Sequence, residues 1–336
     1  MENREVPKSE PLSYEASKAV LKSLSLKTRE SINRRIPELR TINSRLPYVL
    51  NVVAIEDDTF ETNGTRWRPT SIYMKPSKSV VAILQVNPFK GPRYRVNKSR
   101  EEVLEQLFDE YIRDGTVDRA LYICGIPEFM KRRIKNKIDS KMKVTNLQWR
   151  TSNTEDYENF IQFIDLDVLE SVSFYVFGDS PLEFLDKPEI QTCKKLTVSV
   201  ISCYGSQPTN SPVDQLLRLR NQRLQLEYYL FTLHELQLFV QDWITTGREI
   251  GTSFSWAQKR SEDVADILEH LKTHFGAIEA KSNLKCYFSN KTIDVNCITV
   301  KMGQDRELRM FCEEIYFEMK VVAITTAAST VPAADI

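Results

Sequence analysis

Three histidines, His234, His270 and His274, are the imidazoles this chain offers for acid–base or metal chemistry. His270 and His274 stand four residues apart, a spacing that places two side chains on one helix face, where both could bind one metal ion. His234-Glu235 is followed by Leu, Gln and Leu, not by the second histidine of a metalloprotease helix. No further ligand stands at a recognisable spacing, so we interpret these residues as surface histidines and predict no metal site.

The glycines carry no phosphate-binding pattern. There are ten, and they form neither G-x-G-x-x-G nor the P-loop spacing, nor the G-x-S-x-G turn of a serine hydrolase. The sequence therefore predicts no cofactor and favours a non-catalytic protein. An enzyme is the remaining alternative, and it would require a pocket of convergent polar groups.

A basic segment runs from Lys131 to Lys143, with seven Lys or Arg against Asp139, a local charge of +6. Such a segment could bind nucleic acid or direct nuclear import. The stretch 151–170 carries six Asp or Glu and no Lys or Arg, a charge of −6. We expect the two blocks to neutralise each other on neighbouring helices, which does not favour nucleic acid as a partner.

Composition predicts a folded chain inside the cell. The 336 residues are 41% hydrophobic, and 46 basic residues balance 46 acidic ones. The N-terminal residues lack the apolar core of a signal peptide, and no run is long enough for a membrane span. Six cysteines without a C-x-x-C pair indicate reduced thiols, and we expect a cytoplasmic or nuclear protein without a membrane partner. The cysteines are Cys124, Cys193, Cys203, Cys286, Cys297 and Cys312.

The N-terminal half predicts a helical head followed by strands. After a disordered tail over 1–10, residues 11–47 show helical spacing of apolar side chains with arginines between them, broken by Pro37. Residues 48–98 change to β-branched runs, with Asn63-Gly64 as a hairpin turn. The head is thus expected to precede a β-rich segment.

Residues 99–276 alternate between strand-like and helix-like runs. Capping boxes at Ser99 with Glu102 and at Thr232 with Glu235 mark helix starts. The centres of six strand-like runs are 24 or 28 residues apart, a period typical of leucine-rich-type repeats. We predict an α/β fold with a curved, largely parallel sheet; a plain α/β sheet of another strand order is the alternative. The strand centres are Tyr122, Asn146, Phe174, Val198, Leu226 and Phe254.

Side-chain alternation assigns two faces to the last four of these strands. Phe174, Val198, Leu226 and Phe254 should point into the core, and their neighbours should point outward. We predict that the outward residues form a partner-binding face for an unknown protein target. They are Ser173, Tyr175, Thr197, Ser199, Gln225, Glu227, Ser253 and Ser255.

The C-terminal part of the sequence predicts strands without helices. Residues 277–324 are predicted to form a β cap that closes the open end of the sheet, since repeat folds need capping. Residues 325–336 are small and polar and predict a second disordered tail.

Two segments resemble a known family. PLSYEASKAVLKSLSLKTRESINRRIPELRTINSRLP resembles a divergent F-box, with a leading Pro-Leu, an aliphatic helix, an Arg-rich helix and a Pro-x-Leu-Arg close. FTLHELQLFVQDWITTG is similar to the stretch of nematode F-box-associated proteins in which a capped helix ends in Trp-Ile before the next strand.

The resemblance implies a substrate receptor of a cullin-type ubiquitin ligase, with the head docked on a Skp-type adaptor and the repeats holding a target. It departs from typical F-boxes, which carry more aliphatic and aromatic contacts. The alternative is a free-standing binding scaffold whose head serves only as a cap for the repeats. The residues that match the docking positions are Pro11, Leu12, Val20, Leu21, Leu24, Ile32, Ile36 and Pro37.

Overall fold

The structure is a computed structural model, in which two compact units are distinguished. It describes residues 13–43, 45–74, 79–86, 93–112, 115–136, 141–150, 153–177, 183–201, 213–228, 231–257, 266–285, 292–313 and 316–324. The first unit spans Met1–Gln148 with Glu155–Leu169, and the second spans Trp149–Thr154 with Glu170–Ile336. Within the described residues, every helix is too short or too polar to cross a lipid bilayer.

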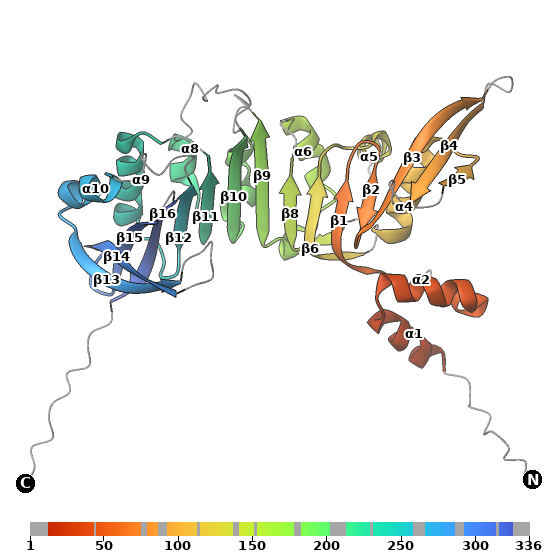
Figure 1. The fold of residues 1–336 in the computed structure, drawn as a ribbon, viewed down its shortest axis with the longest axis horizontal. Helices are drawn as coiled ribbons and strands as arrows, with labels where there is room; N and C mark the ends of the chain where they lie inside the picture. The colour runs from red at the N-terminus through yellow and green to blue at the C-terminus, as the bar shows by residue number, and fades with distance from the viewer. Residues whose placement is uncertain are drawn as a thin grey trace, which may run out of the picture. The chain divides into compact units, whose positions relative to one another are not determined.

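The first unit begins with the predicted helices and continues into a mixed sheet (Figure 1). Its sheet has the order β8-β6-β1-β2-β3-β4-β5, and β7 pairs with β6. Strands β1 and β6 are parallel, while β1, β2, β3, β4 and β5 pair antiparallel in turn. The elements are α1 (Tyr14–Ser23), α2 (Leu26–Arg35), η1 (Pro37–Leu39), α3 (Arg40–Asn43), β1 (Val49–Ile55), β2 (Phe60–Thr62), β3 (Thr65–Met74), β4 (Ser79–Val86), β5 (Arg93–Val96), α4 (Arg100–Tyr111), β6 (Thr116–Ile123), α5 (Glu128–Lys135), β7 (Lys143–Val144), β8 (Asn146–Trp149), α6 (Thr154–Ile161) and η2 (Leu166–Val168).

The second unit places four parallel strands side by side and extends them with antiparallel ones (Figure 1). The order is β9-β10-β11-β12-β16-β15-β14-β13. Helices lie between successive parallel strands along the chain, because parallel neighbours need a crossover connection. The elements are β9 (Ser171–Phe177), η3 (Glu183–Asp186), α7 (Pro188–Thr192), β10 (Lys195–Ile201), α8 (Val213–Arg218), β11 (Arg223–Glu227), α9 (Leu233–Thr246), β12 (Ser253–Ala257), α10 (Ile267–Phe275), β13 (Ile278–Lys285), β14 (Thr292–Lys301), β15 (Arg306–Glu313) and β16 (Tyr316–Ala323).

Local sequence signals set several element ends. Both predicted capping boxes are present, at the start of α4 and at the start of α9. Gly247 and Gly276 end α9 and α10 in the left-handed conformation, with φ of 63° and 61°. Asn63 and Gly64 both have positive φ and join β2 to β3, as the hairpin prediction required.

The fold prediction is confirmed at the level of a mixed α/β protein with a large, partly parallel sheet. Strands β13 to β16 fill the region predicted to be all-strand, and β16 pairs antiparallel with β12. The predicted spacing of 28 residues between the last two strand centres is wrong, because Leu226 lies in register with Trp256, and Phe254 pairs with Leu224. Phe254 and Trp256 are two residues apart, so the predicted face is unchanged.

The core of the second unit lies between the sheet and its helices. Phe174, Val198, Leu226 and Phe254 are all buried, as predicted from alternation. The Phe254 ring packs on Phe239 of α9 with 4.7 Å between ring centroids. The side chains on either side of Phe254 therefore point away from α9.

Candidate functional site

A buried arginine joins helix α2 of the head to the residues that lead into β1. Arg29 of α2 is 2% exposed, and burial lowers its pKa. Its Nε donates to Oδ1 of Asn43 at 2.7 Å, and its Nη atoms donate to the carbonyls of Asn43, Leu46 and Pro47 at 3.0 to 3.3 Å. Its guanidinium also lies 4.0 Å from the centroid of the Tyr48 ring. The head is thus fixed to the chain that enters β1.

A second polar contact connects the head to α4. The Tyr111 hydroxyl donates to Oε1 of Glu30 at 2.6 Å. Burial, and then the bond to Glu30, keep the pKa of Tyr111 far above its usual range. The same residues line a cleft of about 910 Å³, with Tyr48 and Trp67 in its wall and Glu110 beside them. Burial and the Glu30 charge raise the pKa of Glu110.

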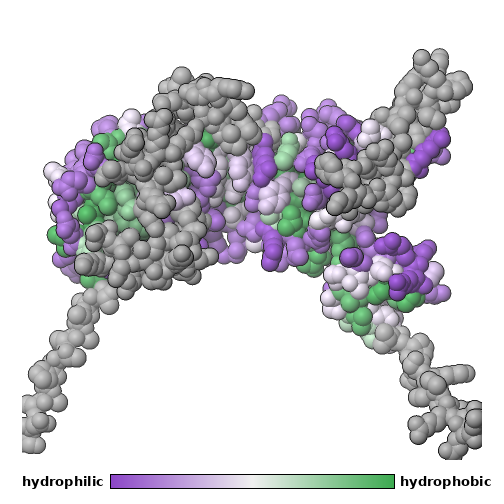
Figure 2. Space-filling view, in the orientation of Figure 1, coloured by the Kyte–Doolittle hydropathy of each residue, from purple (hydrophilic) through white to green (hydrophobic). Residues whose placement is uncertain are grey.

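The predicted docking residues differ in how far their side chains are exposed to solvent. Val20 and Ile36 are 45% and 44% exposed, Pro37 is exposed, and Leu24 and Ile32 are partly buried. The head carries apolar side chains at its surface next to a strongly hydrophilic side (Figure 2). Leu21 is 2% exposed, so its assignment as a docking contact is wrong: it packs inside the head. Pro11 and Leu12 lie outside the described residues.

Fewer residues of the predicted partner-binding face are exposed to solvent than side-chain alternation alone predicts. All eight residues alternate with buried core residues and point away from the helices. Ser173, Tyr175, Glu227 and Ser253 are partly exposed. The other four lie on this face but are buried, so they are not available as contacts there; each of them is flanked on both sides by a paired residue of a neighbouring strand. Their exposed fractions are 8% for Thr197, 2% for Ser199, 8% for Gln225 and 5% for Ser255.

Hydrogen bonds order the end of this face where the parallel strands finish. Ser199 Oγ donates to Oε2 of Glu227 at 2.5 Å, and Gln225 Nε2 donates to Oε1 of the same carboxylate at 2.6 Å. The Arg150 guanidinium lies 4.9 Å from the centroid of the Tyr175 ring. The register places Tyr175 beside Ser199 and Ser199 beside Glu227. Tyr175, Ser199 and Glu227 therefore lie side by side in one row across three strands.

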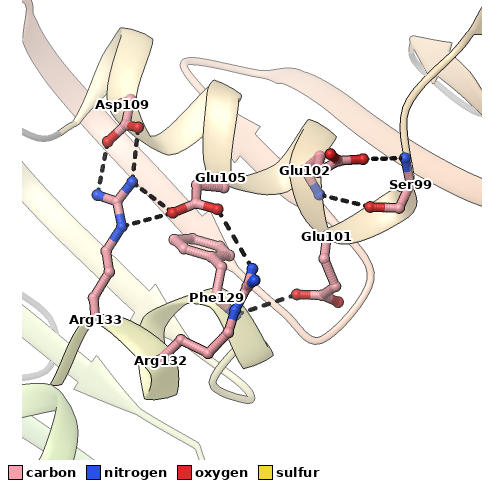
Figure 3. A network of polar contacts seen from close by, with 8 residues as sticks. All are labelled: Ser99, Glu101, Glu102, Glu105, Asp109, Phe129, Arg132 and Arg133. Carbon is pink, nitrogen blue, oxygen red and sulfur yellow. Dashed lines mark hydrogen bonds and ion pairs between the residues drawn. The ribbon is translucent and has the colours of Figure 1, made fainter. Parts of the chain in front are cut away.

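Arg133, from the basic segment, forms ion pairs with the preceding helix (Figure 3). It binds Asp109 at 2.7 Å and Glu105 at 2.9 Å, and lies 5.5 Å from the ring centroids of Phe108 and Phe129. These hydrogen bonds, the one to Asp109 first, raise the pKa of Arg133 despite its burial.

Within the described residues, the predicted neutralisation by the acidic stretch 151–170 is seen at Lys131. Lys131 lies 3.8 Å from Asp156 of α6. Arg132 and Arg133 pair with α4 instead. The sequence did not predict this pairing with α4, because the acidic residues of α4 are spaced along the helix and do not form one continuous run in the sequence. Lys135, Lys141 and Lys143 remain exposed on the surface.

Arg133→Ala is expected to lower the free energy of unfolding by about 2 kcal/mol, since it leaves two carboxylates without their shared cation. Chemical denaturation of the purified protein would measure this loss. Arg132→Ala is the matched control, because the Arg132 side chain is 60% exposed and exposed ion pairs contribute about 0 to 1 kcal/mol. Equal losses for the two variants would contradict a structural role specific to Arg133.

The histidine and cysteine residues fall into ordinary environments. His270 and His274 both contact the Gln237 amide, with 2.7 Å between Nε2 of His274 and Nε2 of Gln237. In the part of the chain that the structure describes, no three Cys, His, Asp or Glu side chains come together to hold a metal ion. Cys124, Cys193, Cys297 and Cys312 are in the reduced thiol form, and burial raises the pKa of Cys193 to about 12. Cys203 and Cys286 lie outside the described residues.

Comparison with known proteins gives one family match. Residues 99–260 match the model of a domain family described as a domain of unknown function, DUF3557. The match starts at the N-cap of α4 and continues past β12, so it covers most of the region predicted to alternate strands and helices. Searches of the curated proteins and of the solved structures find no similar protein.

Proposed function

We propose that this chain is a non-catalytic protein-interaction module that acts as a substrate receptor of a cullin-type ubiquitin ligase. In this proposal the helical head docks on a Skp-type adaptor. The target protein is held by the side of the second unit's sheet that points away from the helices the structure describes, which we call the helix-free face. The F-box resemblance of residues 11–47 supplies the partner class.

The observation that carries the proposal is that some apolar side chains of the head are buried while others are exposed to solvent. Leu21 and Leu26 are buried and support the head from inside, whereas Val20 and Ile36 remain exposed at 45% and 44%. Arg29 is buried and bonds the carbonyls of Leu46 and Pro47, just before β1, while its guanidinium lies over the Tyr48 ring. A head held in this way presents Val20 and Ile36 to a partner at little cost in conformational entropy.

A second function is supported by the same anchoring. The Arg29 and Glu30 contacts are also those expected of a helical cap that seals the first strands. In that case the chain is a free-standing protein-binding scaffold, and its head binds no adaptor.

A test of adaptor capture distinguishes the ligase receptor from the free-standing scaffold. Purified full-length chain is expected to capture a purified Skp-type adaptor, and Val20→Asp with Ile36→Asp should reduce capture at least tenfold, because charges would enter an apolar contact. Leu166→Asp is the matched control, since Leu166 is 45% exposed but lies in η2, outside the head. Failure of the unchanged chain to capture the adaptor would overturn the receptor proposal and leave the scaffold.

A further inference from the structure

The helix-free face of the second unit carries basic residues in register on four strands. Lys195 of β10 pairs with Arg223 of β11, which pairs with Ser253 of β12. Ser253 pairs with Lys320 of β16, and Lys320 pairs with Arg309 of β15. Paired residues lie on the same face of a sheet, and Ser253 points away from α9. We call Lys195, Arg223, Lys320 and Arg309 the basic row.

The basic row places like charges next to one another on neighbouring strands. Lys195 lies beside Arg223, and Lys320 lies opposite Arg309, so two cross-strand pairs bring like charges together. Arg309 also binds Glu307 at 2.7 Å. Arg223 and Lys320 are exposed, and within the described residues neither side chain forms an ion pair. An anionic ligand across the row would pair with the exposed cations of Arg223 and Lys320.

The dimensions of the row fit a short extended peptide. From β10 to β15 there are four strand-to-strand steps, or about 19 Å at roughly 4.8 Å each. A peptide of about six residues spans the same length at ~3.3 Å per residue, with three side chains on one face.

The neighbours of the row favour a peptide over a nucleic acid. Glu318 stands two residues from Lys320 on β16, and Glu307 stands two residues from Arg309 on β15, so carboxylates border the row. A polyphosphate broader than the row would approach these carboxylates, whereas a single extended chain can place its acidic side chains on the row alone.

We propose that the basic row binds a short acidic segment of a protein partner in extended conformation. This inference rests on the proposed function, because it names the chemistry of the target that the helix-free face holds. Of the face predicted from sequence, Ser253 lies within the row, and Ser173, Thr197, Gln225 and Ser255 lie in the adjacent register positions.

Fluorescence anisotropy of the full-length chain with a labelled decapeptide of alternating Asp and Ala tests the proposal. The peptide should bind, and binding should weaken as salt rises, because the row is solvent-accessible. Arg223→Glu with Lys320→Glu should weaken binding at least tenfold. Lys135→Glu with Lys143→Glu makes the same charge change on exposed residues of the first unit and should leave binding unchanged.

Three outcomes would overturn the proposal: no peptide binding, equal loss in both double variants, or binding of a single-stranded oligonucleotide in place of the peptide. The double variant Arg223→Gln with Lys320→Gln separates a loss of binding from a loss of folding. Because it removes like-charge pairs, its melting temperature should be unchanged or higher, while its peptide binding should fall. Adaptor capture measured on the same preparations separates the two proposals, because capture without peptide binding contradicts only the present one.

Discussion

Phe174→Ala is expected to lower the free energy of unfolding by about 3 to 5 kcal/mol. The Phe174 ring is 1% exposed and stacks on Phe184 with 3.9 Å between ring centroids. Alanine would leave a cavity between β9 and η3 that the sheet cannot close, because Phe174 lies in register with Val198 in the middle of parallel strands.

The next residue on the strand provides the control. Tyr175 points away from the helices and is partly exposed, with the Arg150 guanidinium 4.9 Å from its ring centroid. Tyr175→Ala should cost no more than about 1 kcal/mol, the scale of an exposed cation–π contact. Thermal and urea unfolding of both variants measures the difference. If Tyr175→Ala proves as costly as Phe174→Ala, the assignment of faces is wrong, and the partner-binding face with it.

The sequence predicted those parts of the fold that depend on neighbouring residues. Capping boxes gave the starts of α4 and α9, and alternation assigned Phe174 and Val198 to the core. Both signals act over a few residues, so no knowledge of distant segments was needed. The antiparallel β16 beside β12 could not be predicted in this way, because its partner is chosen by exposed backbone groups about 60 residues earlier in the chain.

The candidate surfaces were predicted less completely, because they too depend on contacts between segments that are distant in the sequence. Leu21 and Val20 are adjacent aliphatic residues, and only the packing of the head decides that Leu21 is inside and Val20 outside. The basic row escaped prediction because Lys320 and Arg309 reach Arg223 only through the pairing of β12, β15 and β16. Arg29 was read as one of several polar residues between apolar positions, yet it is buried.

Arg29→Met is expected to lower the free energy of unfolding by about 3 kcal/mol or more. The side chain donates four hydrogen bonds to Asn43, Leu46 and Pro47, and methionine would leave these acceptors without their donor. Arg29→Lys should be nearly as costly, because an ammonium group lacks the planar fork that reaches several acceptors at once. Arg35→Met is the control, since Arg35 is exposed on the same helix.

Hydrogen exchange on Arg29→Met decides what the head does for the rest of the first unit. If the head is a docking element, protection should be lost over residues 13–47 while β1 and β6 keep theirs, because their parallel ladder and buried Leu50 and Val117 do not involve Arg29. If the head is a cap, β1 should lose protection with it, since Arg29 packs on Tyr48 one residue before that strand begins. Loss confined to the head would support a receptor whose docking element folds onto an already stable sheet. Loss that spreads into β1 would make the head part of the core, and the free-standing scaffold would then be the better account.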